Sequence, residues 1–374
     1  MFRPITSAAA SVFLERQAKE IGLQFRQWTG VPGKPVTIMT LPGEDPSLPS
    51  LCLNSHVDVV PVDEDHWDYP PFSATKVDGK IYARGTQDMK CVGMQYLEAL
   101  RVLKERGIKL KRTIHLTFVP DEEIGGHDGM EIFVKDPLFK ELNIGCALDE
   151  GLASESDKFT VFYGERVAWW VTIQSEGPPG HGSRFVKDTA TIKLNKVINR
   201  FLEFRRQQEA ILEGDPTKKL GDVTTVNLTI LRGGVQCNVI PSEAECSFDI
   251  RLPPTVNLEE FQKQIDEWTK EEVSTAAAWM IWDVRVKLNS RSPCHSLPAT
   301  LVASRYCHVA NSMFFATPRY IRATGVPAIG FSPMNNTPVL LHDHNEFLHE
   351  DIYLRGIDIY CEILPALAND TVAK

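Results

Sequence analysis

Histidines and acidic residues recur at five places in the chain, each after a short apolar run or in a loop. They fall at residues 56–58, 88, 121–123, 149–150 and 342–346. Imidazole nitrogens and carboxylate oxygens are ligands that zinc accepts in proteins. In open α/β sheets the ligand crevice lies at the carboxyl ends of the strands, so residues that follow strands can converge there. Together the five segments supply the two histidines and three carboxylates of a paired zinc site.

The acidic triplet Asp121-Glu122-Glu123 follows an apolar run directly. Three adjacent carboxylates repel one another and gain nothing by burial unless cations neutralise them. The alternative is a solvated acidic turn, because Gly125-Gly126 lets the chain turn sharply. Two zinc ions about 3.5–4 Å apart can deprotonate a shared water and polarise a carbonyl, and one acid outside the ligand set must move the proton. The doublet Glu122-Glu123 offers one base and one ligand.

Two of the other segments also have plainer interpretations. His56 and Asp58 lie on the same side of an extended segment, so Asp58 can bond the second ring nitrogen of a metal-bound His56. Taken alone, the pair is better explained as a surface histidine beside an aspartate. Asp88 precedes a predicted helix, and taken alone it is better explained as the helix N-cap, although one carboxylate oxygen can cap while the other binds metal.

The elements that must position these residues alternate between strand and helix. Apolar runs typical of strands occur at Val36–Met39, Leu51–Leu53, Thr113–Val119 and Cys146–Leu148. Between Met89 and Arg106 the apolar residues recur at three- and four-residue steps, which is the helical period. This alternation predicts an α/β layer with a mainly parallel sheet.

The pattern changes near residue 167. The strands predicted beyond it are Trp169–Ile173, Val223–Leu231, Glu243–Arg251 and Trp282–Leu288, and the helices are Thr189–Gln208 and Leu258–Thr269. A four-stranded sheet with two helices would use these pieces. We therefore expect an α/β domain of residues 1–166 and 289–374, interrupted by an inserted α+β domain of residues 167–288.

Composition and charge narrow the class of protein. No apolar run approaches the roughly 18 residues of a membrane helix. The net charge of -9 and pI near 5.6 argue against nucleic acid as the main partner, since phosphate binding draws on clustered Lys and Arg. Eight scattered cysteines without a C-x-x-C pair indicate reduced thiols in a cytoplasmic protein. The N-terminal apolar stretch is short for a signal peptide, and an amphipathic helix from about Ser7 to Ile21 fits better.

The motifs resemble the dizinc aminoacylase, carboxypeptidase and desuccinylase family over about residues 12–285 and 319–367. The resemblance is carried by the segments Asn54–Pro61, Tyr82–Cys91, Thr117–Gly126, Ala147–Gly151, Gly180-His181 and Arg319–Glu350. It implies a zinc-hydrolase catalytic domain with an inserted lid and dimerisation domain. It also implies two Zn²⁺ ions per subunit and hydrolysis of small-molecule N-acyl-L-amino acids, preferably those with neutral aliphatic side chains.

The resemblance also assigns roles to the metal-site residues. It implies that Asp88 bridges both zinc ions, that His56 and Glu150 complete one site, and that Glu123 and His342 complete the other. Glu122 would be the general base, and Asp58 would be the carboxylate that supports His56. His342 is preferred to His344 because it precedes the x-x-Asn345-Glu346 tail, which leaves His344 and His349 with structural roles.

The remaining implied roles concern the substrate and a second subunit. In relatives a histidine like His181 reaches across a dimer interface to stabilise the oxyanion, which a polarised donor can do. Asn238 resembles a substrate contact, and both residues imply a homodimer. Arg319 and Arg322 are candidates for binding the substrate carboxylate, because a guanidinium can bind it in a bidentate manner.

The chain departs from the family's pattern at three places. Relatives usually have a Thr-Asp pair just before the arginine that corresponds to Arg319, whereas this chain has Thr317-Pro318 there. Residues 289–315 lack the expected helix, and the N-terminus is shorter by about one helix. A dipeptidase or desuccinylase with the same centre remains an alternative, as does a dimeric binding protein, although a scaffold has no need of a base such as Glu122.

Overall fold

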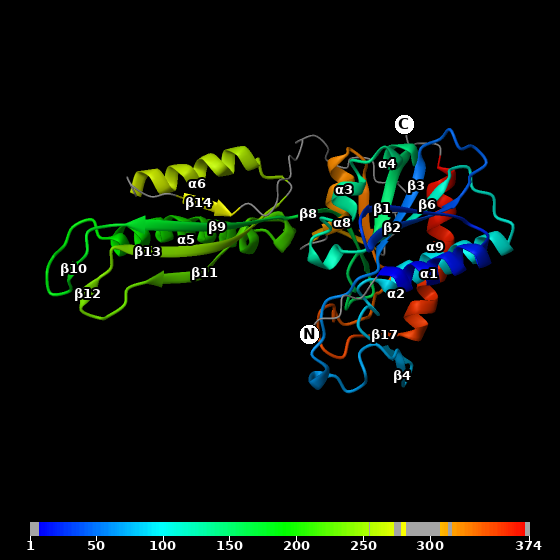
Figure 1. Cartoon of the computed structure of the whole chain (residues 1–374), viewed down its shortest axis with the longest axis horizontal. Helices are drawn as coiled ribbons and strands as arrows, with labels where there is room; N and C mark the ends of the chain where they lie inside the picture. The colour runs from blue at the N-terminus through cyan, green and yellow to red at the C-terminus, as the bar shows by residue number, and fades with distance from the viewer. Residues whose placement is uncertain (1–6, 254, 273–277, 282–306, 313–315, 371–374) are drawn as a thin grey trace. The chain divides into compact units, whose positions relative to one another are not determined.

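The structure, a computed structural model, describes residues 7–253, 255–272, 278–281, 307–312 and 316–370 (Figure 1). The chain divides into two compact units. The first comprises Met1–Gly164 and Arg291–Lys374, and the second comprises Glu165–Ser290.

The first unit is built on an eight-stranded sheet with the strand order β1-β2-β6-β3-β7-β16-β8-β15. Its strands are β1 Gln24–Val31, β2 Lys34–Leu41, β3 Ser50–His56, β6 Ile114–Val119, β7 Ile144–Asp149, β8 Phe159–Glu165, β15 Cys307–Ser312 and β16 Ala328–Phe331. The four central strands β6, β3, β7 and β16 are parallel, whereas β1, β2 and β8 pair antiparallel to their neighbours. The four strands predicted for this unit are confirmed as β2, β3, β6 and β7. The sheet is parallel at its centre and has antiparallel strands toward its edges.

Helices cover both faces of this sheet, and alternate strand residues point into two separate cores. One core joins Leu51 and Leu53 of β3 to α1 (Ser7–Ile21), α2 (Lys90–Glu105) and α9 (Glu350–Asn369). The other joins Cys52 to α3 (Met130–Phe133), α4 (Pro137–Glu141) and α8 (Ala316–Ala323). A strand buried on both faces shows a continuous apolar run, which is why β3 could be predicted. The predicted helices at Ser7–Ile21 and Met89–Arg106 are confirmed.

A small three-stranded sheet brings the C-terminal part of the chain to the segment before α2. It has the order β17-β5-β4, with β4 Thr75–Val77, β5 Lys80–Tyr82 and β17 Phe347–His349. Strands β17 and β5 pair antiparallel through Phe347 and Tyr82. This pairing places residues just before β17 beside the loop that follows β5.

The second unit is an antiparallel sheet with the order β11-β13-β9-β14, packed against two helices. Its elements are β9 Val167–Glu176, β10 Gly180–His181, α5 Ala190–Gly214, η3 Leu220–Asp222, β11 Thr225–Gly233, β12 Val239–Ile240, β13 Glu243–Leu252, α6 Leu258–Glu272 and β14 Ala278–Ile281. Three of the four predicted strands, which correspond to β9, β11 and β13, and both predicted helices are confirmed. The fourth strand of the sheet is β14, Ala278–Ile281. The strand predicted at 282–288 lies outside the described residues.

The unusual segment at residues 289–315 is described only at Cys307–Ser312, which forms β15. The rest of that segment lies outside the described residues. Among the helices that the structure does describe, none has the length and apolar character needed to cross a bilayer.

Candidate metal centre and active site

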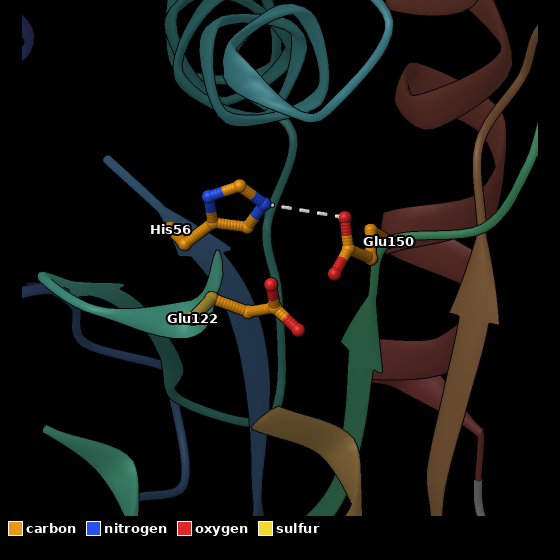
Figure 2. A group of neighbouring side chains, drawn as sticks. All are labelled: His56, Glu122 and Glu150. Atoms are coloured by element: carbon orange, nitrogen blue, oxygen red, sulfur yellow. Dashed lines mark hydrogen bonds and ion pairs between the residues drawn. The ribbon is translucent and has the colours of Figure 1, made fainter. Parts of the chain in front are cut away.

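Four of the predicted site residues lie at the carboxyl edge of the parallel strands. His56 is the last residue of β3, Glu150 directly follows β7, and Glu122 and Glu123 lie in η2 (Glu122–Ile124) just after β6. Parallel neighbours end at the same edge of a sheet, so the fold brings these side chains together. Figure 2 shows the carboxylates of Glu122 and Glu150 and the ring of His56 facing one another.

Asp88 lies between two histidine–carboxylate pairs. Its Oδ1 is 2.9 Å from His56 Nε2 and its Oδ2 is 3.3 Å from His342 Nε2. His56 Nε2 is also 3.3 Å from Glu150 Oε2, and His342 Nε2 is 3.0 Å from Glu123 Oε2. The two oxygens of one carboxylate therefore face two separate ligand sets, which is the arrangement that a bridging ligand requires.

The N-cap interpretation of Asp88 is wrong. Helix α2 begins at Lys90 with Met89 at its cap position, and no side chain caps it. Both carboxylate oxygens of Asp88 face histidines instead. The acidic triplet is also not a solvated turn, because Asp121 and Glu122 are 1% and 9% exposed.

Burial and close contact between carboxylates and imidazoles shift the pKa values of the site residues. Burial, and then the neighbouring Asp88, raise the pKa of Glu150 well above its ordinary value. Burial would lower the pKa of His56, but Glu150, Asp58 and Asp88 outweigh it and raise that pKa. Hydrogen bonds to Asp88 and Glu123 raise the pKa of His342 to about 10. The acids thus favour positive charge on both imidazoles.

The residues present fit a pair of divalent cations. Two groups, His56-Glu122-Glu150 and His56-Asp88-Glu123, place one ligand atom of each residue within 4.8 Å of one another. Glu123 Oε1 is buried and has no hydrogen-bond partner in the described part of the chain. Leaving a buried carboxylate oxygen unpaired is costly, and a cation would remove that cost. Nitrogen and carboxylate ligands suit zinc, cobalt or manganese.

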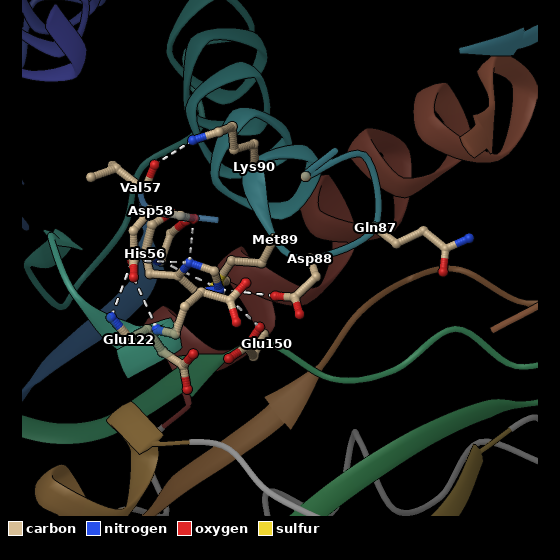
Figure 3. Close-up of polar contacts among 12 residues, drawn as sticks. His56, Val57, Asp58, Gln87, Asp88, Met89, Lys90, Glu122 and Glu150 are labelled. Atoms are coloured by element: carbon tan, nitrogen blue, oxygen red, sulfur yellow. Dashed lines mark hydrogen bonds and ion pairs between the residues drawn. The ribbon is translucent and has the colours of Figure 1, made fainter. Parts of the chain in front are cut away.

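Asp58 fixes both a ligand and the acidic turn. Its backbone carbonyl lies 3.0 Å from His56 Nδ1, and its carboxylate Oδ1 lies 3.4 Å from the same nitrogen. The carboxylate also accepts hydrogen bonds from the backbone N–H groups of Glu122, at 3.1 Å, and Glu123, at 3.0 Å. The contacts of Asp58 with His56 and Glu122 can be followed in Figure 3. One residue, Asp58, therefore orients the imidazole of His56 through its backbone carbonyl and its carboxylate, and its carboxylate holds the turn that carries Glu122 and Glu123.

The predicted substrate residues of the first unit, Arg319 and Arg322, both lie on α8 but contact different parts of the chain. Arg319 Nη2 donates to Gly125 O at 3.0 Å, on the turn that follows Glu123. Tyr320 Oη donates to the same carbonyl at 2.8 Å. Arg322 Nη1 donates to Ala328 O at 2.7 Å, at the start of β16.

His181 and Asn238 belong to the second unit and lie close together there. The backbone N–H of Gly182 donates to Asn238 O at 2.8 Å, and His181 pairs with Val239 between β10 and β12. The His181 ring is exposed, and its Nδ1 lies 2.8 Å from Ser183 Oγ. Ser183 thereby orients the ring.

The other two histidines near His342 have separate contacts. His344 stacks on His66 with ring centroids 5.0 Å apart, and His349 Nδ1 accepts a hydrogen bond from Asp351 N at the start of α9. Neither histidine contacts Asp88 in the way that His56 and His342 do.

Sequence reasoning missed the residues that hold Asp88 in place. Arg84, Gln87 and Glu346 are buried polar side chains that connect the loop after β5 to the segment before β17. The available signal was their position, since each lies within four residues of a predicted ligand. Their partners are distant in sequence, so the pattern could not identify the contacts.

The chain is similar to proteins of known family over most of its length. The model of peptidase family M20/M25/M40 matches residues 52–366. Aminoacylase-1 of Mus musculus is 51% identical over 373 residues, covering 96% of this chain and 90% of the relative. Aminoacylase-1 of Homo sapiens is 51% identical over 374 residues with the same coverage, and that of Dictyostelium discoideum is 49% identical over 384 residues, covering 96% and 92%.

Solved structures share the fold at low sequence identity. Aminopeptidase PepT from Bacillus cereus superposes with a TM-score of 0.70 at 16% identity, covering 97% of this chain and 94% of that one. The M20 family metallo-carboxypeptidase Sso-CP2 from Sulfolobus solfataricus has a TM-score of 0.66 at 18% identity, covering 98% and 96%. The YXEP protein of Bacillus subtilis, described as a dinuclear metal binding peptidase, has a TM-score of 0.66 at 16% identity, covering 99% and 94%.

Proposed function

The chain belongs to peptidase family M20/M25/M40, and on that premise we propose that it hydrolyses N-acyl-L-amino acids, preferring neutral aliphatic ones, to a carboxylate and a free L-amino acid. The aminoacylase-1 relatives, which align with almost the whole chain, support this activity. The observation that carries the proposal is the position of Asp88 between two histidine–carboxylate pairs, with Glu122 beside them.

Two zinc ions are the proposed cofactor. His56 and Glu150 would hold one ion, Glu123 and His342 the other, and Asp88 would bridge them. When bound, such a pair supplies Lewis acidity toward the acyl carbonyl and lowers the pKa of a bound water. The two histidines and four acids nearby have the ligand chemistry for this role.

The proton transfers are assigned to Glu122. Its carboxylate takes a proton from the attacking water, whose oxygen forms the new bond to the acyl carbon. It then gives that proton to the nitrogen of the leaving amino acid as the amide C–N bond breaks. Asp58 supports both steps, since it fixes the backbone N–H of Glu122 and the ring of His56.

Arg319 is the better of the two candidates for the substrate carboxylate. Its guanidinium contacts the turn that carries Glu122 and Glu123, whereas Arg322 bonds the chain at the start of β16. A guanidinium binds a carboxylate in a fixed planar geometry. We assign Asn238 a contact with the substrate from the second unit.

A homodimer is proposed through the second unit. Strand β11 is an edge strand, and Leu231 near its end is 64% exposed. An edge strand with exposed apolar side chains is a template for pairing with another chain. The six cysteines found free among the described residues agree with a reducing, cytoplasmic location.

The direct test is hydrolysis of N-acetyl-L-methionine by the metal-free protein with and without added zinc. Zinc-dependent release of methionine would support the aminoacylase assignment. N-succinyl amino acids and dipeptides are assayed in parallel. Preference for either substrate would replace the assignment by a desuccinylase or a dipeptidase. Absence of turnover on all three, with two zinc ions bound, would favour a binding role.

His181→Ala is expected to lower kcat by about 10²–10³ without loss of metal, because an oxyanion donor acts mainly in the transition state. The cross-subunit role is tested by mixing His181→Ala with Glu122→Gln subunits after dissociation. If His181 acts on the partner's site, randomly paired dimers regain about a quarter of wild-type activity, because half are hybrids with one complete site. No recovery, with hybrid dimers demonstrated, would place His181 on its own subunit's site.

A further inference from the structure

Glu346 is a fully buried carboxylate that holds the loop leading to Asp88. It accepts hydrogen bonds from Arg84 Nη1 at 2.8 Å and from the backbone N–H groups of Gly85 at 3.1 Å, Gln87 at 2.6 Å and Asp88 at 3.3 Å. The loop has no helical or strand hydrogen bonds here, so these N–H groups depend on this carboxylate. An apolar side chain at position 346 would leave several buried donors unpaired.

The same loop holds the segment that carries His342. Gln87 Nε2 donates to Pro338 O at 3.0 Å and to Phe347 O at 2.8 Å, and Gln87 Oε1 accepts from Leu340 N at 3.0 Å. In Figure 3 the Gln87 side chain points away from the group around Asp88, toward other parts of the chain. The Gln87 side chain therefore holds the backbone on both sides of His342 and is not itself a proposed metal ligand.

Arg84 connects the two segments at a second point. While Nη1 bonds Glu346, Nη2 donates to the backbone carbonyl of His342 at 3.3 Å. His342 has φ +65° and Asn345 has φ +55°, a left-handed backbone region that is uncommon for non-glycine residues, although His and Asn adopt it more often than most. Contacts of the backbone at this point help to hold it there. The Arg84 and Glu346 side chains are 2% and 0% exposed, so the ion pair lies beyond the screening of solvent.

We propose that Arg84, Gln87 and Glu346 form a reciprocal clamp that sets the separation of Asp88 from His342 and thereby positions half of the metal centre. Glu346, on the His342 segment, fixes the backbone of Asp88. Gln87 and Arg84, on the Asp88 loop, fix the backbone around His342. The three are positioning residues, and the inference rests on the proposed function, in which Asp88 and His342 hold metal.

The test uses the full-length protein with Glu346→Gln and Gln87→Leu. In each variant, the zinc ion that Asp88, Glu123 and His342 are proposed to hold is expected to lose about 10–100-fold in affinity, as is typical when the residues that orient metal ligands are altered. Affinity is measured by competition with a chromophoric chelator. The visible spectrum of the cobalt-loaded variants should also change, because the coordination geometry around Asp88 and His342 changes. Gln87→Leu keeps the Arg84–Glu346 pair, so the test stands even if Glu346→Gln folds poorly.

Asp249→Asn is the matched control, since Asp249 belongs to the second unit, accepts from Arg251 Nε at 2.7 Å and Trp170 Nε1 at 2.9 Å there, and is not a proposed metal ligand. It should lower thermal stability without changing metal affinity or the cobalt spectrum. Folded Gln87→Leu protein with wild-type affinity and spectrum would overturn the clamp alone. Wild-type protein that binds no metal pair would overturn the proposed function, and the clamp with it.

Discussion

Glu122→Gln is expected to keep both metal ions and to lose kcat by about 10⁴, the upper range for removal of a general base. The amide has nearly the shape of the carboxylate but cannot accept the proton of the attacking water. The four histidine–carboxylate distances around Asp88 involve Glu123 and Glu150 and leave Glu122 outside both pairs. The measurement is kcat with N-acetyl-L-methionine, together with the zinc content of the same preparation by elemental analysis.

Glu98→Gln is the control for this substitution. Glu98 lies on α2 and pairs with Arg101 on the surface, so the same chemical change there should leave both kcat and zinc content at wild-type values. The contrary result would be Glu122→Gln protein that is folded but has lost zinc. That outcome would make Glu122 a ligand and would move the role of base to Glu123.

The sequence was most informative where strands are buried on both faces. β3 and β7 contain short apolar runs because helices cover the sheet on both sides, and β6 has four apolar residues beside His115 and Thr117. The residues that follow these strands could therefore be assigned to one edge. His56, Glu122, Glu123 and Glu150 come together for that reason. Short strands such as β16, with only four residues between Pro327 and Ser332, carry too little pattern to be predicted.

The contacts that join distant segments could not be predicted from local pattern. The preference of aspartate for the position before a helix favoured Asp88 as a helix cap. That preference contains no information about His342, which lies far along the chain. The burial of Glu346 beside Asp88 likewise depends on the pairing of β17 with β5. Such contacts are tertiary. The resemblance to the dizinc family implied that Asp88 joins the sites of His56 and His342, whereas the local pattern around Asp88 did not.

Asp88→Ala is expected to remove both metal ions and all measurable turnover, a loss of at least about 10⁶-fold given the rate enhancements of enzymes. Its two oxygens are the groups that face both His56 and His342, so one truncation takes a ligand from each proposed site. His342→Ala should be milder in metal content, because the pair of His56 and Glu150 remains with Asp88. Elemental analysis after dialysis against a fixed zinc concentration distinguishes the two variants.

The comparison depends on showing that loss of metal is not loss of fold. Asp45→Ala provides the control, because Asp45 bonds only the nearby Ser47 among the side chains described and lies in an exposed turn. It should retain zinc and activity, and circular dichroism should show Asp88→Ala folded at the assay temperature. If folded Asp88→Ala protein still binds one zinc tightly, Asp88 serves a single ion. The two histidine–carboxylate pairs would then be independent sites, and the shared water that the proposed mechanism requires would lose its structural basis.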